Sequence, residues 1–406
     1  MMSKIDIKPF FRFSQVRIVN QRVLDDLSMV WIKAVPDKRY IPICSECGTK
    51  SRSIHSYERR IVRDMNMFKT KVYIEYTYRK IRCKKCSNIK VEDLGLVDPY
   101  KRITRRFAQY IVDLCKYMTV EDVANLLEVD RKLVKKLHKE YLQSNFGKDV
   151  YSGLGIIAID EISLKKGHKY LTIMIDYETG RIVHVGRGRK YKTLKGFFKK
   201  IPKRDRKKIE AACMDMWDPY IKAVRKWCPN ASIVFDLFHV VQAFGRVINK
   251  VRNIEYKRAS NRFKEVIKGT KYMLLKNRGN LKRRESQRLR ELLEINKNLS
   301  IVYILKDQIK RLWNYRYKGW VIKGIRSFVE MAKESGIRPL ISFAKTISKY
   351  AYGIINHCKY PIHTSRLEGI NNKIKVIKRK AYGFHDIEYF SLIIKSSFVP
   401  LQLIRT

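Results

Sequence analysis

Three aspartates end three short apolar runs in the middle of the chain, and a glutamate opens a basic stretch near its end. Asp160 ends "GIIAID", Asp215 ends "IEAACMD", Asp236 ends "ASIVFD", and Glu368 stands in "TSRLEGINNKIKVIKRKAYGF". One aspartate after a strand is an ordinary turn residue, but three in succession favour a functional site at the edge of a sheet. Carboxylate oxygens gathered there suit Mg²⁺ or Mn²⁺, and two such ions can drive phosphodiester chemistry.

The stretch around Glu368 predicts an amphipathic helix over residues 364–384. At helical spacing one face is polar and carries Glu368, Asn372, Lys375 and Arg379, and the other is apolar and carries Ile370, Ile374, Ile377 and Ala381. A solvated helix would explain one acid beside the positive N-terminal dipole. The alternative is a metal ligand followed by a track of DNA-binding side chains, and the three aspartates favour it.

Three aspartates compete to be the second metal ligand, namely Asp215, Asp218 and Asp236. The strand that ends at Asp215 is expected beside the one that ends at Asp160, and the strand that ends at Asp236 one place further out. Because neighbouring strands are about 4.8 Å apart, the adjacent pair suits a two-ion site better, which favours Asp215. Asp218 is expected to cap a helix. Asp236 and His239 are expected to support the site from the start of the following helix.

Two Cys-x-x-C pairs form a second set of candidate ligands. Cys44 and Cys47 stand in "PICSECGTK", and Cys83 and Cys86 in "RKIRCKKCSNIK". Apolar and polar residues alternate over 71–79, which predicts a strand that leads into the second pair, with a hairpin between the two pairs. Four thiolates on two knuckles give the closed tetrahedral site of structural zinc, whereas unpaired cytosolic cysteines are the alternative.

Residues 104–138 predict three short helices. Thr119 can cap the second helix in a capping box with Asp122, and Asp130 can cap the third. Glu128 stands in the turn between them, where glycine is common. A helix-turn-helix is predicted, with a plain three-helix bundle as the alternative. The candidate DNA-binding residues on the third helix are Arg131, Lys132, Lys135 and Lys136.

The remaining pattern predicts a multidomain α+β protein. After residue 155 the expected order is β-β-β-α-β-α-β, which is the order of an RNase H-like α/β core. A basic, helical stretch then predicts a large all-α insertion before the helix of Glu368. The expected divisions are a zinc-ribbon domain over 1–98, a helix-turn-helix domain over 99–150, the first part of the core over 151–244, the insertion over 245–360 and the completion of the core over 361–406.

Composition indicates the partner. Lys+Arg 88 against Asp+Glu 38 gives a formal net charge of +50, and a surface so charged repels itself unless it meets a polyanion, of which nucleic acid is the first candidate. Hydrophobic residues make up 45% of the chain, which excludes a disordered basic protein. No apolar run is long enough for a membrane span, and the paired cysteines favour metal over disulfides, so a cytoplasmic, nucleoid-associated protein is expected.

Three motifs together resemble bacterial insertion-sequence transposases of the DDE type, in the ISL-three family. They are "AIDEISLKKGHKYLTIMID", "MDMWDPYIKAV…PNASIVFDLFHVV" and "LEGINNKIKVIKRKAYGF", within a resemblance that spans roughly residues 40–398. The resemblance implies a zinc ribbon, a helix-turn-helix and a catalytic triad of Asp160, Asp215 and Glu368. It also places Asp236 and His239 in a signature of related transposases. Ser365 and Arg366 depart from the Ser-Asn-Gly that often precedes the glutamate.

The implied activity is metal-dependent cutting and rejoining of double-stranded DNA at the terminal inverted repeats of the element, by at least a homodimer since two ends must meet. An RNA-guided or structure-selective nuclease is one alternative, although its expected carboxylate order is Asp, Glu, Asp, with zinc knuckles near the C-terminus. A non-catalytic zinc and helix-turn-helix regulator is another, although all three acids are present.

Overall fold

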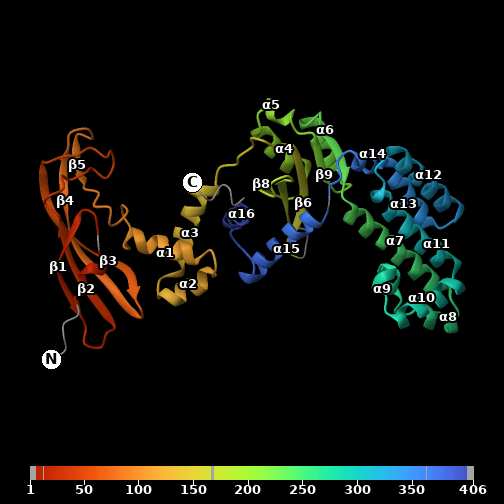
Figure 1. The fold of residues 1–406 in the computed structure, drawn as a ribbon, viewed down its shortest axis with the longest axis horizontal. Coiled ribbons are helices and arrows are strands. Elements are labelled where there is room, and N and C mark those ends of the chain that lie inside the picture. Colours follow the sequence, from red (N-terminus) through yellow and green to blue (C-terminus); the bar gives the residue numbers. More distant parts are fainter. Residues whose placement is uncertain (1–5, 12, 166–168, 363, 400–406) are drawn as a thin grey trace. The chain divides into compact units, whose positions relative to one another are not determined.

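The chain divides into two compact units, residues 1–145 and 146–406. The computed structural model describes residues 6–11, 13–165, 169–362 and 364–399, and Figure 1 shows their helices and strands. No helix among these residues is both long enough and apolar enough to cross a bilayer.

The first unit begins with a five-stranded sheet that contains a long hairpin, β3–β4, of which β4 is the central strand. The strands are β1 (Val16–Val23), β2 (Met29–Pro36), β3 (Ile54–Met67), β4 (Thr70–Cys83) and β5 (Asn88–Val91), in the order β1-β2-β4-β3 with β5 paired to β4, after a short 3-10 helix η1 (Lys8–Phe10). Alternation along β4 buries Val72 and Ile74 on the core face, as the period of two predicts. The hairpin between the two cysteine pairs is therefore confirmed, whereas β1 and β2 were not predicted.

Three helices complete the first unit and form the predicted helix-turn-helix. They are α1 (Arg105–Leu114), α2 (Val120–Leu127) and α3 (Arg131–Phe146). Thr119 and Asp122 form the capping box of α2, and Asp130 accepts hydrogen bonds from the first backbone amides of α3. Glu128 ends α2 in the left-handed conformation, with φ of 51°, which is the geometry that usually selects glycine.

The second unit is built on a mixed sheet with the predicted strand order. It contains β6 (Ile156–Lys165), β7 (Lys169–Asp176), β8 (Ile182–Arg187), β9 (Ala211–Met214) and β10 (Ser232–Phe235), in the order β10-β9-β6-β7-β8. The meander β6-β7-β8 is antiparallel, and β9 and β10 run parallel to β6. This is the RNase H-like arrangement.

One expected boundary is wrong. β6 does not end at Asp160 but continues to Lys165, because its residues keep pairing with β7 from Asp160 opposite Ile173 to Ser163 opposite Tyr170. Asp160 therefore lies inside a strand, where ladder hydrogen bonds hold its backbone.

Helices cover both faces of this sheet. The helices on one face are α4 (Tyr191–Lys200), α5 (Lys203–Arg206) and α6 (Asp218–Trp227); those on the other are α15 (Thr364–Lys380) and α16 (Ile387–Ser396). Side chains alternate between the two faces, so that Ile157 packs with the α4 and α6 core and Ala158 with the α15 and α16 core. Each face of the sheet therefore has its own hydrophobic core.

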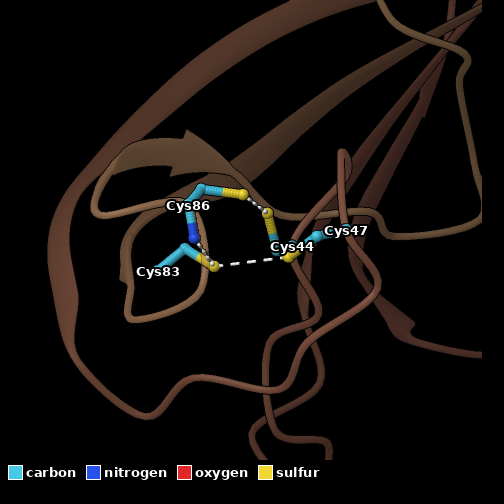
Figure 2. Close-up of side chains that lie close together, drawn as sticks. All are labelled: Cys44, Cys47, Cys83 and Cys86. Atoms are coloured by element: carbon cyan, nitrogen blue, oxygen red, sulfur yellow. Dashed lines mark hydrogen bonds between the residues drawn. The ribbon is translucent and has the colours of Figure 1, made fainter.

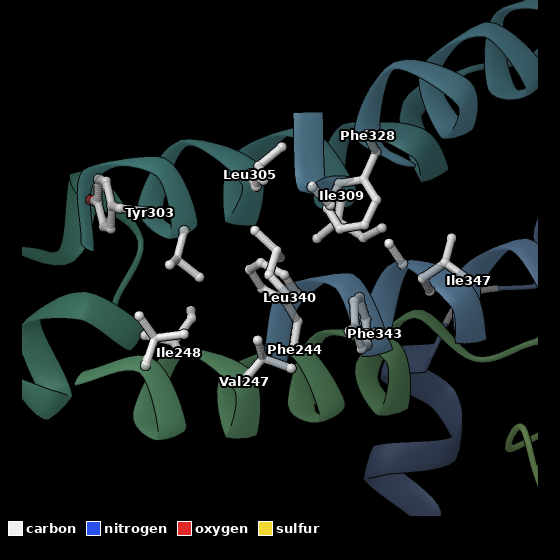
Figure 3. Packing of buried hydrophobic residues seen from close by; sticks show 14 of the residues in the cluster. Phe244, Val247, Ile248, Tyr303, Leu305, Ile309, Phe328, Leu340, Phe343 and Ile347 are labelled. Carbon is white, nitrogen blue, oxygen red and sulfur yellow. The ribbon is translucent and has the colours of Figure 1, made fainter. Parts of the chain in front are cut away.

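The large insertion is all helical, as predicted. Its helices are α7 (Leu237–Arg258), α8 (Asn261–Ile267), α9 (Lys271–Leu275), α10 (Arg283–Ile295), α11 (Lys297–Arg311), α12 (Lys318–Glu334), α13 (Arg338–Lys349) and α14 (Ala351–Ile355), with 3-10 turns η2 (Arg278–Asn280), η3 (Leu312–Asn314) and η4 (Asn356–Cys358). Aromatic residues from α7, α12 and α13 meet in its core, where Phe244 lies against Phe328 and Phe343 (Figure 3). Trp313 is part of this core, whereas Trp320 is exposed.

Candidate functional site

Four cysteines converge at one end of the first sheet. The ligand atoms of Cys44, Cys47, Cys83 and Cys86 all lie within 4.8 Å of one another, with Sγ–Sγ distances of 3.9 Å between Cys44 and Cys86 and 3.4 Å between Cys47 and Cys83 (Figure 2). Pairing of β4 with β5 brings the second knuckle back on itself. A cluster of four thiols at this spacing fits the closed tetrahedral coordination of zinc.

The basic face of α3 is accessible at three of its four predicted positions. Arg131, Lys132 and Lys136 are exposed, and Lys135 is half-buried. Arg131 forms an ion pair of 3.0 Å with Glu121 of α2, in which both side chains remain largely exposed. Such a pair is worth little in water, so Arg131 is available to a phosphate.

The three aspartates lie in one row across three neighbouring strands. Ala158 of β6 pairs with Cys213 of β9, and Met214 of β9 pairs with Phe235 of β10. Continuing this register places Asp160, Asp215 and Asp236 side by side. Because side chains alternate along a strand, all three point to the face that α15 and α16 cover.

His239, in the first turn of α7, lies between the three carboxylates. Its Nδ1 is 2.9 Å from Asp215, and its Nε2 is 3.9 Å from Asp160 and 3.8 Å from Asp236. Burial alone would lower the pKa of His239, but the hydrogen bond to Asp215 and the three negative charges raise it to about 9. The imidazole is therefore a cation at neutral pH and balances part of the charge of the site.

The outer two aspartates are the more deeply buried ones. Burial raises the pKa of Asp236 to about 6, and it also raises the pKa of Asp160. The Asp236 carboxylate caps α7 by accepting a hydrogen bond of 2.8 Å from the backbone amide of Phe238. By contrast, the side chain of Asp215 is 30% exposed.

Helix α15 contacts this row through Asn371, whose side-chain amide donates to the carboxylate of Asp160. Asn371 was not predicted, although it lies three residues after Glu368 and therefore on the same side of the helix. Glu368 itself is exposed and forms no hydrogen bond or ion pair with another described residue. The structure thus brings together Asp160, Asp215 and Asp236, and leaves Glu368 about one helical turn from the contact.

The other predicted polar residues of α15 are accessible, because Asn372, Lys375 and Arg379 are exposed while Ile370 and Ile374 are buried. The helix ends at Lys380, so Ala381 lies outside it and not on its apolar face as expected.

Asp218 does not act as the expected helix cap. It is the first residue of α6, and its carboxylate accepts a hydrogen bond of 2.8 Å from the hydroxyl of Tyr350 and lies 3.2 Å from Lys349. Asp218 therefore ties the core to the helical insertion.

An arginine held by two aromatic rings just before α4 was also missed. The guanidinium of Arg189 lies over the rings of Tyr170, at 4.6 Å, and Trp217, at 4.9 Å, and its Nη1 is 3.7 Å from Glu161. Trp217 also donates from its indole nitrogen to the backbone carbonyl of Arg189. No spacing rule links these residues in the sequence, because they come from separate loops and strands.

Fold and site together define an RNase H-like core with a row of carboxylates, in a chain that also carries a zinc-ribbon and helix-turn-helix unit, and comparison with known families agrees with this description. Residues 157–394 match a family described as "Transposase", residues 42–86 match the "zinc-finger of transposase IS204/IS1001/IS1096/IS1165", and residues 92–139 match the "Helix-turn-helix domain of transposase family ISL3". The chain belongs to transposase family ISL3. It is a DNA transposase, an enzyme that cleaves DNA and transfers strands, and its zinc-ribbon domain supports a structural zinc at the four cysteines.

Two curated relatives extend the comparison. The chain is 37% identical over 361 residues to the "Transposase for insertion sequence element IS1001" of Bordetella parapertussis, covering 88% of this chain and 89% of the relative. It is 25% identical over 263 residues to the "Transposase for insertion sequence element IS1557" of Mycobacterium tuberculosis (strain ATCC 25618 / H37Rv), covering 58% of each.

Proposed function

We propose that this transposase binds the terminal inverted repeats of an insertion sequence and cuts them with divalent metal held by Asp160, Asp215 and Glu368. The observation that carries the proposal is the row of aspartates on three adjacent strands, which point to the face covered by α15. Glu368 lies on the side of α15 that reaches this row through Asn371. A set of carboxylate oxygens alone fits Mg²⁺ or Mn²⁺.

Asp215, not Asp236, is proposed as the second ligand. The strand before Asp215 is the direct neighbour of β6, so its carboxylate lies one strand spacing, about 4.8 Å, from that of Asp160, whereas Asp236 lies two spacings away. Asp215 is also the more accessible of the two. Asp236 already uses its carboxylate to cap α7.

The surrounding side chains would hold these ligands in place. Asn371 donates to Asp160 and fixes the rotation of that carboxylate, and His239 does the same for Asp215 through Nδ1. Bound divalent ions would supply activation of the attacking hydroxyl and stabilisation of the leaving oxygen. The three carboxylates raise the pKa of His239, so they stabilise a positive charge at this position.

The DNA is proposed to contact both units. The exposed Asn372, Lys375 and Arg379 continue the side of α15 that carries Glu368 and would hold the cut strand by its phosphates. Element ends would be recognised by α3 through Arg131, Lys132, Lys135 and Lys136. Pairing two element ends would require at least a dimer in the DNA complex. Because its substrate is DNA, the protein is proposed to act in the cytoplasm, in association with the nucleoid.

The division of labour among segments is part of the proposal. The boundaries expected from sequence, at residues 98, 150, 244 and 360, would separate zinc ribbon, helix-turn-helix, the two parts of the core and the helical insertion. They refine the observed division into two units, whose border lies at residue 145.

The proposal is tested with labelled duplexes that carry the terminal repeat read from the DNA flanking the gene. Asp160→Asn, Asp215→Asn and Glu368→Gln are each expected to abolish strand cleavage in Mg²⁺, a loss of at least about 10³-fold, while binding in the absence of metal stays within about twofold. Glu178→Gln is the matched control, because Glu178 is an acid of the same core outside the proposed metal site. Cleavage by Glu368→Gln at the parent rate would contradict the assignment of the helix.

A further inference from the structure

The β3–β4 hairpin ends in a fully exposed phenylalanine in an unfavourable backbone conformation. Met67 pairs with Thr70, which leaves Phe68 and Lys69 as the turn. The Phe68 side chain is 99% exposed, and its φ is 54°. This left-handed region costs free energy for any residue with a Cβ, and hairpin turns favour glycine or asparagine there. Neither packing nor turn geometry therefore explains a phenylalanine at this position.

The same hairpin is rigidly attached to the helix-turn-helix. The backbone of Arg63 in β3 pairs with the segment before α1, and the buried Asp64 accepts hydrogen bonds from Thr104 and Arg106. At the tip, Lys71 forms an ion pair with Glu128, which lies in the turn between α2 and α3. The exposed ring is therefore held beside the turn that leads into the candidate recognition helix, within one compact unit.

A second hairpin tip lies directly alongside and makes a useful contrast. The Thr70 hydroxyl donates to the backbone carbonyl of Leu27, at 2.7 Å, and Leu27 is likewise apolar, left-handed at φ 55° and 65% exposed. Its neighbours Asp25 and Asp26 are acidic and would repel a phosphate backbone, whereas the neighbour of Phe68 in its turn is the exposed base Lys69. The two tips therefore differ in charge: the tip at Leu27 is acidic and the tip at Phe68 is basic.

We propose that Phe68 is a DNA wedge: its ring enters a groove next to the site read by α3 and inserts partly between two base pairs, bending the duplex. The ligand is double-stranded DNA, because the exposed base Lys69 shares the turn with the ring and Lys71 ties this tip to the turn before the basic helix α3, so that the charge next to the ring is complementary to a polyanion. Apolar side chains presented in this way unstack one base step and allow more contact with the protein. The inference rests on the proposed recognition of element ends, and adds a residue that would deform the DNA.

The wedge is tested with the full-length protein and no added divalent metal, so that binding and bending are measured without cutting. The probe is a short duplex carrying the terminal repeat, with a fluorophore at each end to report bending and 2-aminopurine at successive positions to report unstacking. The parent should raise energy transfer between the ends and increase the 2-aminopurine signal at one step. Phe68→Ala should lose both signals and bind about tenfold more weakly, as expected for one lost ring–base stacking contact.

Three further variants separate a wedge from a structural role. Phe68→Trp should keep both signals, because an aromatic ring is retained. Phe68→Gly should lose both without lowering the thermal midpoint, since glycine adopts positive φ without strain. Leu27→Ala, the matched control at the adjacent tip, should bend DNA like the parent.

The proposal is overturned if Phe68→Ala bends and unstacks the duplex like the parent, if Leu27→Ala loses as much, or if the parent itself leaves the duplex straight. Cleavage is measured separately by adding Mg²⁺. A parent that bends DNA but never cuts it would contradict the proposed catalytic site and leave the wedge standing. A parent that cuts DNA without unstacking any base step would contradict the wedge and leave the proposed catalytic site standing.

Discussion

The two candidate metal sites of this transposase are assembled in opposite ways. The four cysteines come from two knuckles and already lie within 4.8 Å of one another. The candidate carboxylates come from β6, from the residues just after β9 and β10 and, as proposed, from the distant helix α15, and His239 lies between the three aspartates. A closed cluster set by local turns suits a metal that holds the fold, whereas an open cluster set by strand register suits metals that meet a substrate.

The largest expected effect follows from removing the closed cluster. Cys44→Ser should abolish zinc retention and unfold the zinc-ribbon part of the first unit, because structural zinc in small domains contributes about 10–16 kcal/mol of apparent binding free energy to folding. Zinc content and limited proteolysis measure this outcome. Cys115→Ser is the control, since Cys115 lies in the same unit outside the cluster. A protease-resistant, zinc-free Cys44→Ser protein would show that thiol packing alone suffices.

The stability of the second unit should depend on pH when no metal is bound at the carboxylate row. His239 has its pKa raised from 6.5 to about 9 by Asp215, Asp236 and Asp160, against the opposing effect of burial. Its contribution to stability is therefore fully present below pH 6.5 and is lost as pH rises through about 9. Since one pKa unit corresponds to about 1.4 kcal/mol, the shift limits this contribution to roughly 3–4 kcal/mol.

Chemical unfolding of the metal-free protein between pH 6.5 and 9.5 measures that loss. His239→Gln should remove the slope in this window, and added Mg²⁺ should flatten it in the parent. An unchanged slope in His239→Gln would mean that other groups titrate there.

A smaller effect on stability is expected where the helical insertion packs against β10, the strand that precedes Asp236. Gly353 in α14 lies so close to β10 that an added Cβ would be 2.3 Å from the Phe235 ring, one residue before Asp236. Gly353→Ala should destabilise the second unit by about 1–3 kcal/mol through overpacking. Gly196→Ala in α4 meets no atom within 4 Å and should stabilise by up to about 1 kcal/mol. Thermal unfolding compares the pair, and equal midpoints would contradict this close packing.

Sequence patterns predicted what depends on local spacing. The cysteine knuckles, the Thr119 capping box and the strand order β10-β9-β6 all follow from motifs or from chain connectivity. Asp160, Asp215 and Asp236 were recognised because each follows an apolar run. The resemblance to a known family supplied the roles that spacing alone leaves open.

What could not be predicted depends on contacts between distant segments. β6 continues past Asp160 because β7 pairs with it, and Asp218 contacts Tyr350 of the insertion, a residue far along the chain. Asn371, and not the predicted Asn372, contacts Asp160 because packing of Ile370 and Ile374 fixes the rotation of α15. The left-handed backbone conformation at Phe68 is one that local propensity disfavours for phenylalanine.

The central claim is that Asp160 and Asp215, on adjacent strands, hold the metal while Asp236 supports the site from outside. Cleavage of the terminal-repeat duplex by Asp215→Cys and Asp236→Cys, each in Mg²⁺ and in Mn²⁺, tests it most directly. A thiolate tolerates the softer ion better, so Asp215→Cys should be inactive in Mg²⁺ and regain cleavage in Mn²⁺. Asp236→Cys should show the same reduced activity with either ion. Manganese rescue of Asp236→Cys, with Asp215→Asn still cutting DNA, would contradict the account and make Asp236 the ligand.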